Sequence, residues 1–183
     1  MKSYLVFFIL ICSTYLLHAQ RFYRSSSQKL NQVNQEKLKQ GKWVELSGDK
    51  VKSITNYKDD QLHGLIIKYW SNGHLKSEEE FRNNIPHGYF NDYYRTGDRN
   101  RNGNYHRGQK NGMFKKYWQN GELRTQSSFE NDIEHGKTME YYKDGTLKRE
   151  IPYEQGVVKG NIKVYSKKGE LVRSKTYVGS SVN

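Results

Sequence analysis

The stretch HGLIIKYWSNGHLKSEEEF at residues 63–81 decides the fold, because the chain repeats it. It returns as NGMFKKYWQNGELRTQSSF at residues 111–129, two steps of 24 residues later, and as HGKTMEYYKDGTLKREIPY at residues 135–153, one further step later. Self-similarity at a fixed period of this length indicates a repeat architecture, in which each period forms one small supersecondary unit.

Five sequence columns keep the 24-residue step. The leading glycines are Gly64, Gly88, Gly112, Gly136 and Gly160, and the second glycines, nine positions later, are Gly73, Gly97, Gly121, Gly145 and Gly169. The invariant tyrosines, five positions after the leading glycines, are Tyr69, Tyr93, Tyr117, Tyr141 and Tyr165. The pattern is completed by a leucine column (Leu75, Leu123, Leu147 and Leu171, with Arg99 in the second unit) and a distal aromatic column (Phe81, Tyr105, Phe129, Tyr153 and Tyr177). The columns define five full units, and a degraded unit precedes them at Gly41, Trp43, Val51 and Tyr57.

Each unit predicts a β-hairpin. In the first full unit we expect strands at residues 65–70 and 75–81, joined by a turn at Ser71-Asn72-Gly73. Asn-Gly is typical of hairpin turns because glycine adopts a positive φ without a Cβ clash. We assign the leading glycines to the reverse turns between successive hairpins. The predicted fold is all-β: an elongated, open antiparallel sheet of stacked hairpins with about twelve strands.

Alternation along a strand predicts what each face of the sheet carries. Counted from the leading glycine, odd positions hold the invariant tyrosine, the leucine and the distal aromatic, which we expect on one face. Even positions of the first strand form a second stripe on the other face: Ile66, Phe90, Phe114 and Ile162, followed by Trp70, Tyr94, Trp118 and Tyr142. Pro152, on a return strand, predicts a bulge or an edge there because proline lacks a ladder donor.

These columns resemble the bacterial variant of the MORN repeat, the form found in YwqK-family antitoxin-like proteins. The elements that carry the resemblance are H/N-G, Y-[YW]-x-[ND]-G-x-L and the distal aromatic, and they extend over about residues 41–179. The resemblance implies stacked antiparallel hairpins in an open, twisted sheet, and it implies little about chemistry. The second unit departs from the pattern at Arg99 and in its polar RNRNGN segment, so we expect looser packing there.

The N-terminus has the features of a secretory signal. Lys2 supplies a positive charge, residues 4–17 an apolar stretch, and Leu17-His18-Ala19 a cleavage box, so we expect a signal peptide at residues 1–19 that is cleaved after Ala19. An uncleaved anchor is the alternative. Residues 20–40 form a polar linker with room for one helical turn near residues 35–40, residues 41–179 the repeat array, and residues 180–183 a tail. The predicted location is the periplasm, the cell surface or the medium.

Composition limits the classes of core and partner. Only 34% of the 183 residues are hydrophobic and mean hydropathy is −1.02, which disfavours a thick closed core, whereas aromatic residues (14%) in register disfavour disorder. The net charge is +12, and from residue 159 onward six basic residues accompany one acidic residue. This end could attract anionic lipid or polysaccharide, or be an ordinary solvated surface. Export and the lack of a recognised module disfavour nucleic acid. Open edges at Trp43 and Tyr177 could template edge-to-edge self-association.

The sequence predicts neither a catalytic site nor a cofactor or metal. Cys12, the one cysteine, lies in the signal segment. His63, His87 and His135 share one column, but Asn111 and Lys159 interrupt it and no carboxylate column completes a ligand set. Glu78, Glu79 and Glu80 alternate between faces and offer no pair with contrasting surroundings.

The aromatic even-position stripe is the candidate binding surface, and its residues are Trp70, Tyr94, Trp118, Tyr142, Lys68 and Lys116. The alternative is that these rings only cover the sheet. We therefore expect a non-catalytic exported scaffold that mediates protein–protein or cell-envelope interaction. The alternatives are an immunity or antitoxin-like protein that masks a toxin sterically, and a binder of anionic lipid or polysaccharide.

Overall fold

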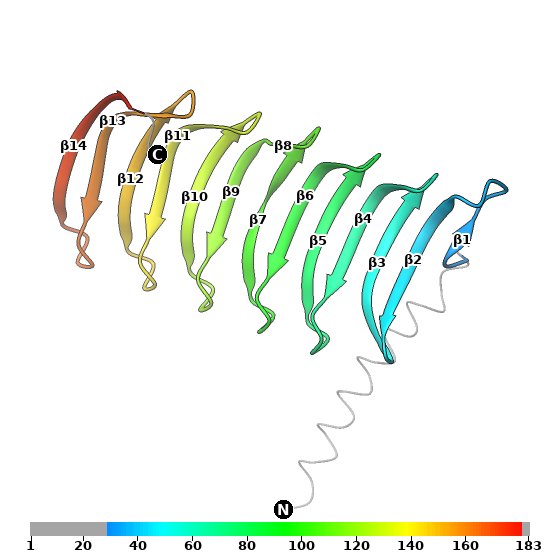
Figure 1. The fold of residues 1–183 in the computed structure, drawn as a ribbon. Helices are drawn as coiled ribbons and strands as arrows, with labels where there is room; N and C mark the ends of the chain where they lie inside the picture. The colour runs from blue at the N-terminus through cyan, green and yellow to red at the C-terminus, as the bar shows by residue number, and fades with distance from the viewer. Residues whose placement is uncertain (1–28, 181–183) are drawn as a thin grey trace, which may run out of the picture. The chain divides into compact units, whose positions relative to one another are not determined.

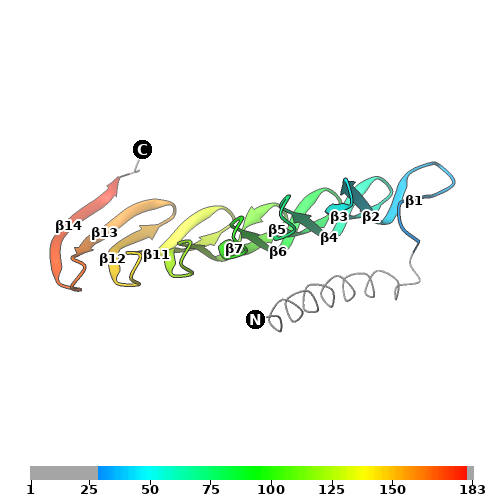
Figure 2. The same cartoon turned by 90° about the horizontal axis from the view of Figure 1, so that it is seen from below.

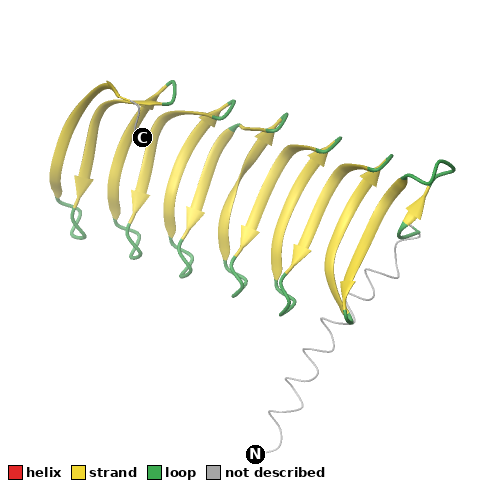
Figure 3. Ribbon diagram, in the orientation of Figure 1, coloured by secondary structure: helices red, strands yellow, loops and turns green. Residues whose placement is uncertain are grey.

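A computed structural model describes residues 29–180, and residues 32–180 of these contribute fourteen antiparallel strands to one open sheet (Figure 1). The predicted signal peptide, residues 20–28 of the predicted linker and residues 181–183 of the tail lie outside the described residues. Figure 3 shows strands and loops throughout the described part, with no helix there. The all-β, open-sheet prediction is confirmed.

Neighbouring strands in the chain are neighbours in the sheet, apart from the short β8, which pairs with β7 alone. The strands are β1 (Gln32–Val33), β2 (Lys39–Ser47), β3 (Lys50–Lys58), β4 (Gln61–Tyr69), β5 (Leu75–Arg82), β6 (Ile85–Tyr93), β7 (Arg99–His106), β8 (Gln109–Lys110), β9 (Gly112–Tyr117), β10 (Leu123–Glu130), β11 (Ile133–Tyr141), β12 (Leu147–Glu154), β13 (Val157–Tyr165) and β14 (Leu171–Ser180). The helical turn expected near residues 35–40 is wrong: residues 35–36 form a turn, residues 37–38 follow without regular structure, and β2 begins at Lys39.

The turn within each unit forms where the second glycine predicts it. Gly73 has φ 90° and its N–H donates to the Trp70 carbonyl at 2.8 Å, while the Trp70 N–H donates to the His74 carbonyl at 2.8 Å. This is a type I turn followed by a glycine in the left-handed region, a common three-residue hairpin connection. The same pair of bonds recurs around the other four second glycines.

The leading glycines do not form the turns between units, and that prediction is wrong. Gly64 lies inside β4 with φ 95°, opposite a register shift between Thr55 and Tyr57 of β3. The other leading glycines also have positive φ. A glycine of this kind produces a β-bulge, which bends the strand without ending it. Pro152 lies at the equivalent register shift in the β12–β13 pair, as its position predicted.

The turns between units fall four to five residues earlier, at two-residue loops. Their central residues all have positive φ: Asp59-Asp60, Asn83-Asn84, Arg107-Gly108, Asn131-Asp132 and Gln155-Gly156. Two successive residues with positive φ define a type I′ turn, whose twist matches that of the flanking strands. Asparagine and aspartate tolerate this region, so most of these turns form without glycine.

Strand pairing also corrects the predicted faces. Gly64 faces Phe81 and Ile66 faces Glu79, so the distal aromatics share a face with the even positions. We call this the aromatic face; it carries Ile66, Phe90, Phe114, Phe81, Tyr105, Phe129 and Tyr153. The opposite tyrosine face carries the invariant tyrosines and, as predicted, their leucine partners, for example Tyr69 facing Leu75. The turn that joins the two strands decides whether odd or even positions of the return strand lie on a given face. Alternation within one strand does not reveal this.

The core lies on the aromatic face. Its buried residues are Ile66, Ser77, Ser127, Thr138, Ile151 and Val158, and Val158 has no exposed surface. Figure 2 shows the hairpins of the sheet side by side in a single layer. Rings on neighbouring strands provide much of the cover: the centroids of Phe90 and Phe114, in successive hairpins, lie 5.6 Å apart, and those of Phe114 and Phe129, within one hairpin, lie 5.3 Å apart. Side chains of the same face therefore bury one another.

Candidate binding site

The four aromatic residues predicted to bind a partner lie at the start of the hairpin turns, where they join successive units. The Trp70 indole N–H donates to the Tyr93 carbonyl at 3.1 Å, and the Tyr94 hydroxyl donates to the Tyr117 carbonyl at 2.7 Å. Trp118 and Tyr142 donate in the same way to Tyr141 and Tyr165, at 3.2 and 3.0 Å. We call these four bonds the inter-unit bonds. They give each ring a structural role whether or not it also contacts a partner.

Cationic side chains cover three of the four rings. Lys76 Nζ lies 4.7 Å from the Trp70 ring centre, Arg124 Cζ 4.5 Å from that of Trp118, and Lys148 Nζ 5.8 Å from that of Tyr142. In the remaining unit Asn100 takes the place of the cation. The turn end of the sheet therefore presents cations stacked on aromatic rings.

A hollow on the aromatic face brings two of the predicted site residues together. Its cavity volume is about 330 Å³, and its lining includes Lys68, Trp70, Lys76, Glu79, Asp92 and Arg101. A second hollow of about 190 Å³ shares Glu79, Asp92 and Arg101 and extends to Phe90 and Tyr105. Lys116, the other predicted lysine, is exposed on the same face, where it faces Arg101 of the preceding unit.

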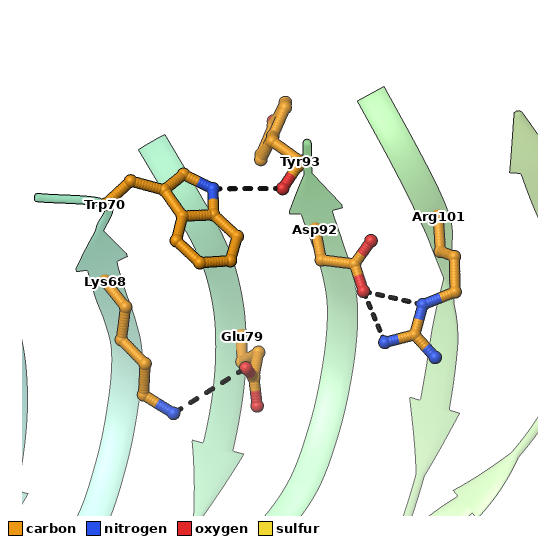
Figure 4. A network of polar contacts seen from close by, with 6 residues as sticks. All are labelled: Lys68, Trp70, Glu79, Asp92, Tyr93 and Arg101. Atoms are coloured by element: carbon orange, nitrogen blue, oxygen red, sulfur yellow. Dashed lines mark hydrogen bonds and ion pairs between the residues drawn. The ribbon is translucent and has the colours of Figure 1, made fainter. Parts of the chain in front are cut away.

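The polar side chains of the hollow form two ion pairs (Figure 4). Arg101 Nε donates to Asp92 Oδ2 at 2.6 Å, and a second guanidinium nitrogen contacts the same oxygen. Lys68 Nζ lies 3.9 Å from Glu79 Oε1. The Asp92 side chain is 17% exposed, and its Oδ1 is buried without a hydrogen-bond partner among the described residues. A buried acceptor without a partner costs about 1–3 kcal/mol.

Burial sets the electrostatics of the tyrosines around these sites. Burial raises the pKa of Tyr105, beside the second hollow. On the tyrosine face, burial and the neighbouring charge of Glu78 raise the pKa of Tyr93, whose hydroxyl donates to Glu78 at 3.1 Å. Both hydroxyls are protonated at neutral pH, and that of Tyr93 acts as a hydrogen-bond donor.

The histidine column makes ordinary surface contacts. His63 Nδ1 lies 3.1 Å from Asn83 Oδ1, and the His87 ring centre lies 5.4 Å from that of His106. Among residues 29–180, no group of three or more histidine, cysteine or acidic side chains could hold a metal ion. Nor does the described part of the chain contain a helix long and apolar enough to cross a bilayer.

Sequence reasoning found Lys68 and Trp70 but missed Glu79, Asp92 and Arg101. Glu79 was correctly separated from Glu78 and Glu80, since it faces Ile66 while they lie on the other face. Asp92 and Arg101 carry opposite charges and lie nine residues apart, on the two sides of a turn. Glu140 and Arg149 repeat this arrangement and form a 2.9 Å ion pair. That recurrence is the signal that could have identified the pair.

The geometry defines an open sheet of repeated hairpins with a polar hollow on one face. Three segments, residues 62–83, 110–131 and 134–155, match the family described as MORN repeat variant. No curated protein matches the chain. MORN repeats are generally protein- or membrane-binding modules. The second full hairpin lies outside the matched segments but keeps the same pairing, with Gly88 facing Tyr105.

Proposed function

We propose that this chain is a non-catalytic scaffold that binds a protein partner across its aromatic face, centred on the hollow beside Trp70. The observation that carries the proposal is the open hollow, in which Glu79 and Asp92 lie beside Arg101 on one face of the sheet. Polar groups of a partner would bind these charged side chains. Lys68, Lys76 and Trp70 surround them with an amphipathic rim suited to protein recognition.

The mixed charge of the hollow supports protein recognition over polymer or metal binding. Two carboxylates and three cations line it together, so it presents neither a uniform anion site nor a cation cage. The ion pair between Asp92 and Arg101 holds both groups in fixed orientations. A surface of this kind selects a partner by complementary placement of charges.

The test compares two faces of one strand. Lys116 lies on the aromatic face and its neighbour Lys115 on the tyrosine face, since Lys115 pairs with Asn102 and Lys116 with Arg101. Substitution of either by glutamate changes net charge equally. The chain without residues 1–19 serves as bait in an extract of the cell envelope, and quantitative mass spectrometry measures each captured protein.

We expect a partner whose capture falls at least fivefold with K116E and stays within twofold of wild type with K115E. The inter-unit bonds involve neither lysine, so the fold is retained, which circular dichroism verifies. Equal losses with both variants would indicate bulk electrostatics and reject the aromatic face. Trp70→Ala and Trp118→Ala are unsuitable here because they also remove inter-unit bonds.

The proposal includes export. Residues 1–19 support it with a basic start, an apolar stretch and a small residue at the expected cleavage point. Expression of the full chain in a bacterial host should give an extracytoplasmic product that begins at Gln20, as measured by intact mass. Ile9→Arg, which interrupts the apolar stretch, should leave an uncleaved cytoplasmic chain. An uncleaved wild-type product would reject cleavage after Ala19.

A further inference from the structure

The two ends of the sheet differ in how their edges are covered. At the first end, β1 pairs with β2, the Asn31 N–H donates to the Lys42 carbonyl at 2.9 Å, and the Asn31 side-chain oxygen accepts from the Val44 N–H at 2.7 Å. At the other end, β14 pairs with β13 over eight registered positions, and no described strand pairs with its outer edge. In the described part of the chain, β14 therefore has an open edge ten residues long.

Apolar side chains of β14 are exposed beside this edge. Leu171, Val172 and Val178 are 55%, 61% and 88% exposed, among the largest values for apolar residues in the described chain. Open edges with exposed apolar side chains favour the addition of another strand, which satisfies the backbone and covers the side chains. A strand bound here would occupy the place that the next unit takes elsewhere in the array.

The charge of β14 determines which kind of added strand it can bind. Arg101 and Arg149 occupy one column of the return strands, and each forms an ion pair within its own hairpin, with Asp92 and Glu140. Arg173 is next in that column, but it faces Val164 and forms no ion pair with a described residue. Its guanidinium is therefore available to an acidic group on an added strand.

The repeat also fixes where that acidic group should lie. Each return strand pairs with the first strand of the next unit in a constant register: Ser77 faces Asp92, Thr125 faces Glu140, Arg101 faces Lys116 and Arg149 faces Val164. Arg101 and Arg149 face no carboxylate of the next unit because Asp92 and Glu140 already neutralise them within their own hairpins. Arg173 has Val164 in place of that carboxylate. An added strand in the same register would place its equivalent residue opposite Arg173, where a carboxylate gains an ion pair and a lysine meets repulsion.

We infer that β14 binds an extended acidic segment of a partner protein as an additional antiparallel strand, with a carboxylate opposite Arg173. A second copy of this edge is a poor occupant, because residues 159–180 contain six basic residues against Glu170 alone. The inference is independent of the hollow beside Trp70, since it uses the backbone edge of the last hairpin. Either surface can fail its test without affecting the other.

The experiment uses a labelled ten-residue peptide with the sequence of residues 133–142 (IEHGKTMEYY), which contains a strand that already pairs with a return strand in this protein. Fluorescence anisotropy measures its binding to the full chain. We expect E140K in the peptide, or Arg173→Glu in the protein, to weaken binding about fivefold, the upper range for an exposed ion pair. Combining the two substitutions should restore binding.

Controls locate the site. Lys163→Glu makes the same charge change on β13, away from the edge and on the tyrosine face, and should leave binding within twofold. Hydrogen exchange should show new protection in β14 and none in β2 or β10. The inference is overturned by an absence of peptide binding, by equal effects of the two protein variants, or by protection in β10 rather than β14. Binding to phosphatidylglycerol vesicles without peptide binding would assign the edge to a membrane surface instead, and dimerisation through β14 would assign it to a second copy.

Discussion

The inter-unit bonds should contribute measurable and additive stability. Tyr94→Phe removes one hydroxyl that donates to the Tyr117 carbonyl at 2.7 Å and leaves the ring in place. A single hydrogen bond contributes about 0.5–1.5 kcal/mol net, so we expect a loss of about 1 kcal/mol. Tyr142→Phe removes the equivalent bond to Tyr165 at 3.0 Å. Because the two bonds share no partner, the double variant should lose about 2 kcal/mol.

Thermal unfolding followed by circular dichroism measures this effect. For a chain of this length, 1 kcal/mol corresponds to a shift in Tm of about 2–4 °C, so the double variant should unfold about 4–8 °C below wild type. Tyr89→Phe is the matched control, since Tyr89 is exposed and its hydroxyl makes no hydrogen bond to a described residue. It should change stability by less than about 0.5 kcal/mol. Equal shifts for Tyr94→Phe and Tyr89→Phe would refute a role for these bonds.

Three further predictions concern packing, turns and pH. Gly103→Ala should destabilise the chain by about 1–3 kcal/mol, measured by urea unfolding, because its Cβ would lie 2.7 Å from the Phe114 ring. Arg107→Asn should stabilise it by about 1 kcal/mol in the same assay, because Arg107 has φ 51° in a type I′ turn and asparagine tolerates that region. Burial raises the pKa of Tyr105, so the folded state retains that proton when the unfolded chain loses it. The contribution of Tyr105 to the free energy of unfolding should therefore be fully present below pH about 10 and be lost as the pH rises through that value. Urea midpoints measured from pH 8 to 11 should fall less steeply in Tyr105→Phe than in wild type.

The repeat made the fold class, the hairpins and the turns at the second glycines predictable. The errors have one physical origin: a column of glycines indicates that the backbone has a positive φ there, but not whether a turn or a bulge requires it. Gly73 lies in a turn and Gly64 in a bulge, and both satisfy the same conformational need. The type I′ turns escaped notice because pairs such as Asn83-Asn84 take positive φ without glycine.

The candidate site was harder to predict because it depends on pairing between strands. Alternation within one strand predicts that Lys68 and Tyr69 lie on opposite faces of the sheet. The turn, however, decides which residues of the return strand lie on the same face as Lys68. That connection puts Phe81 and Glu79 on the aromatic face. The bonds made by Trp70 and Tyr94 to the next unit depend on ring orientation, which residue spacing does not specify.

The order of the strands has a mechanical consequence. Each strand of the array is held by its immediate neighbours, and the first and last strands lie at opposite ends of the sheet. A pulling force between those ends would load the strand pairs in series and separate them one after another. When the chain is attached at its two ends, it should extend in small successive steps at low force and shorten again when the force is released, instead of unfolding in a single event.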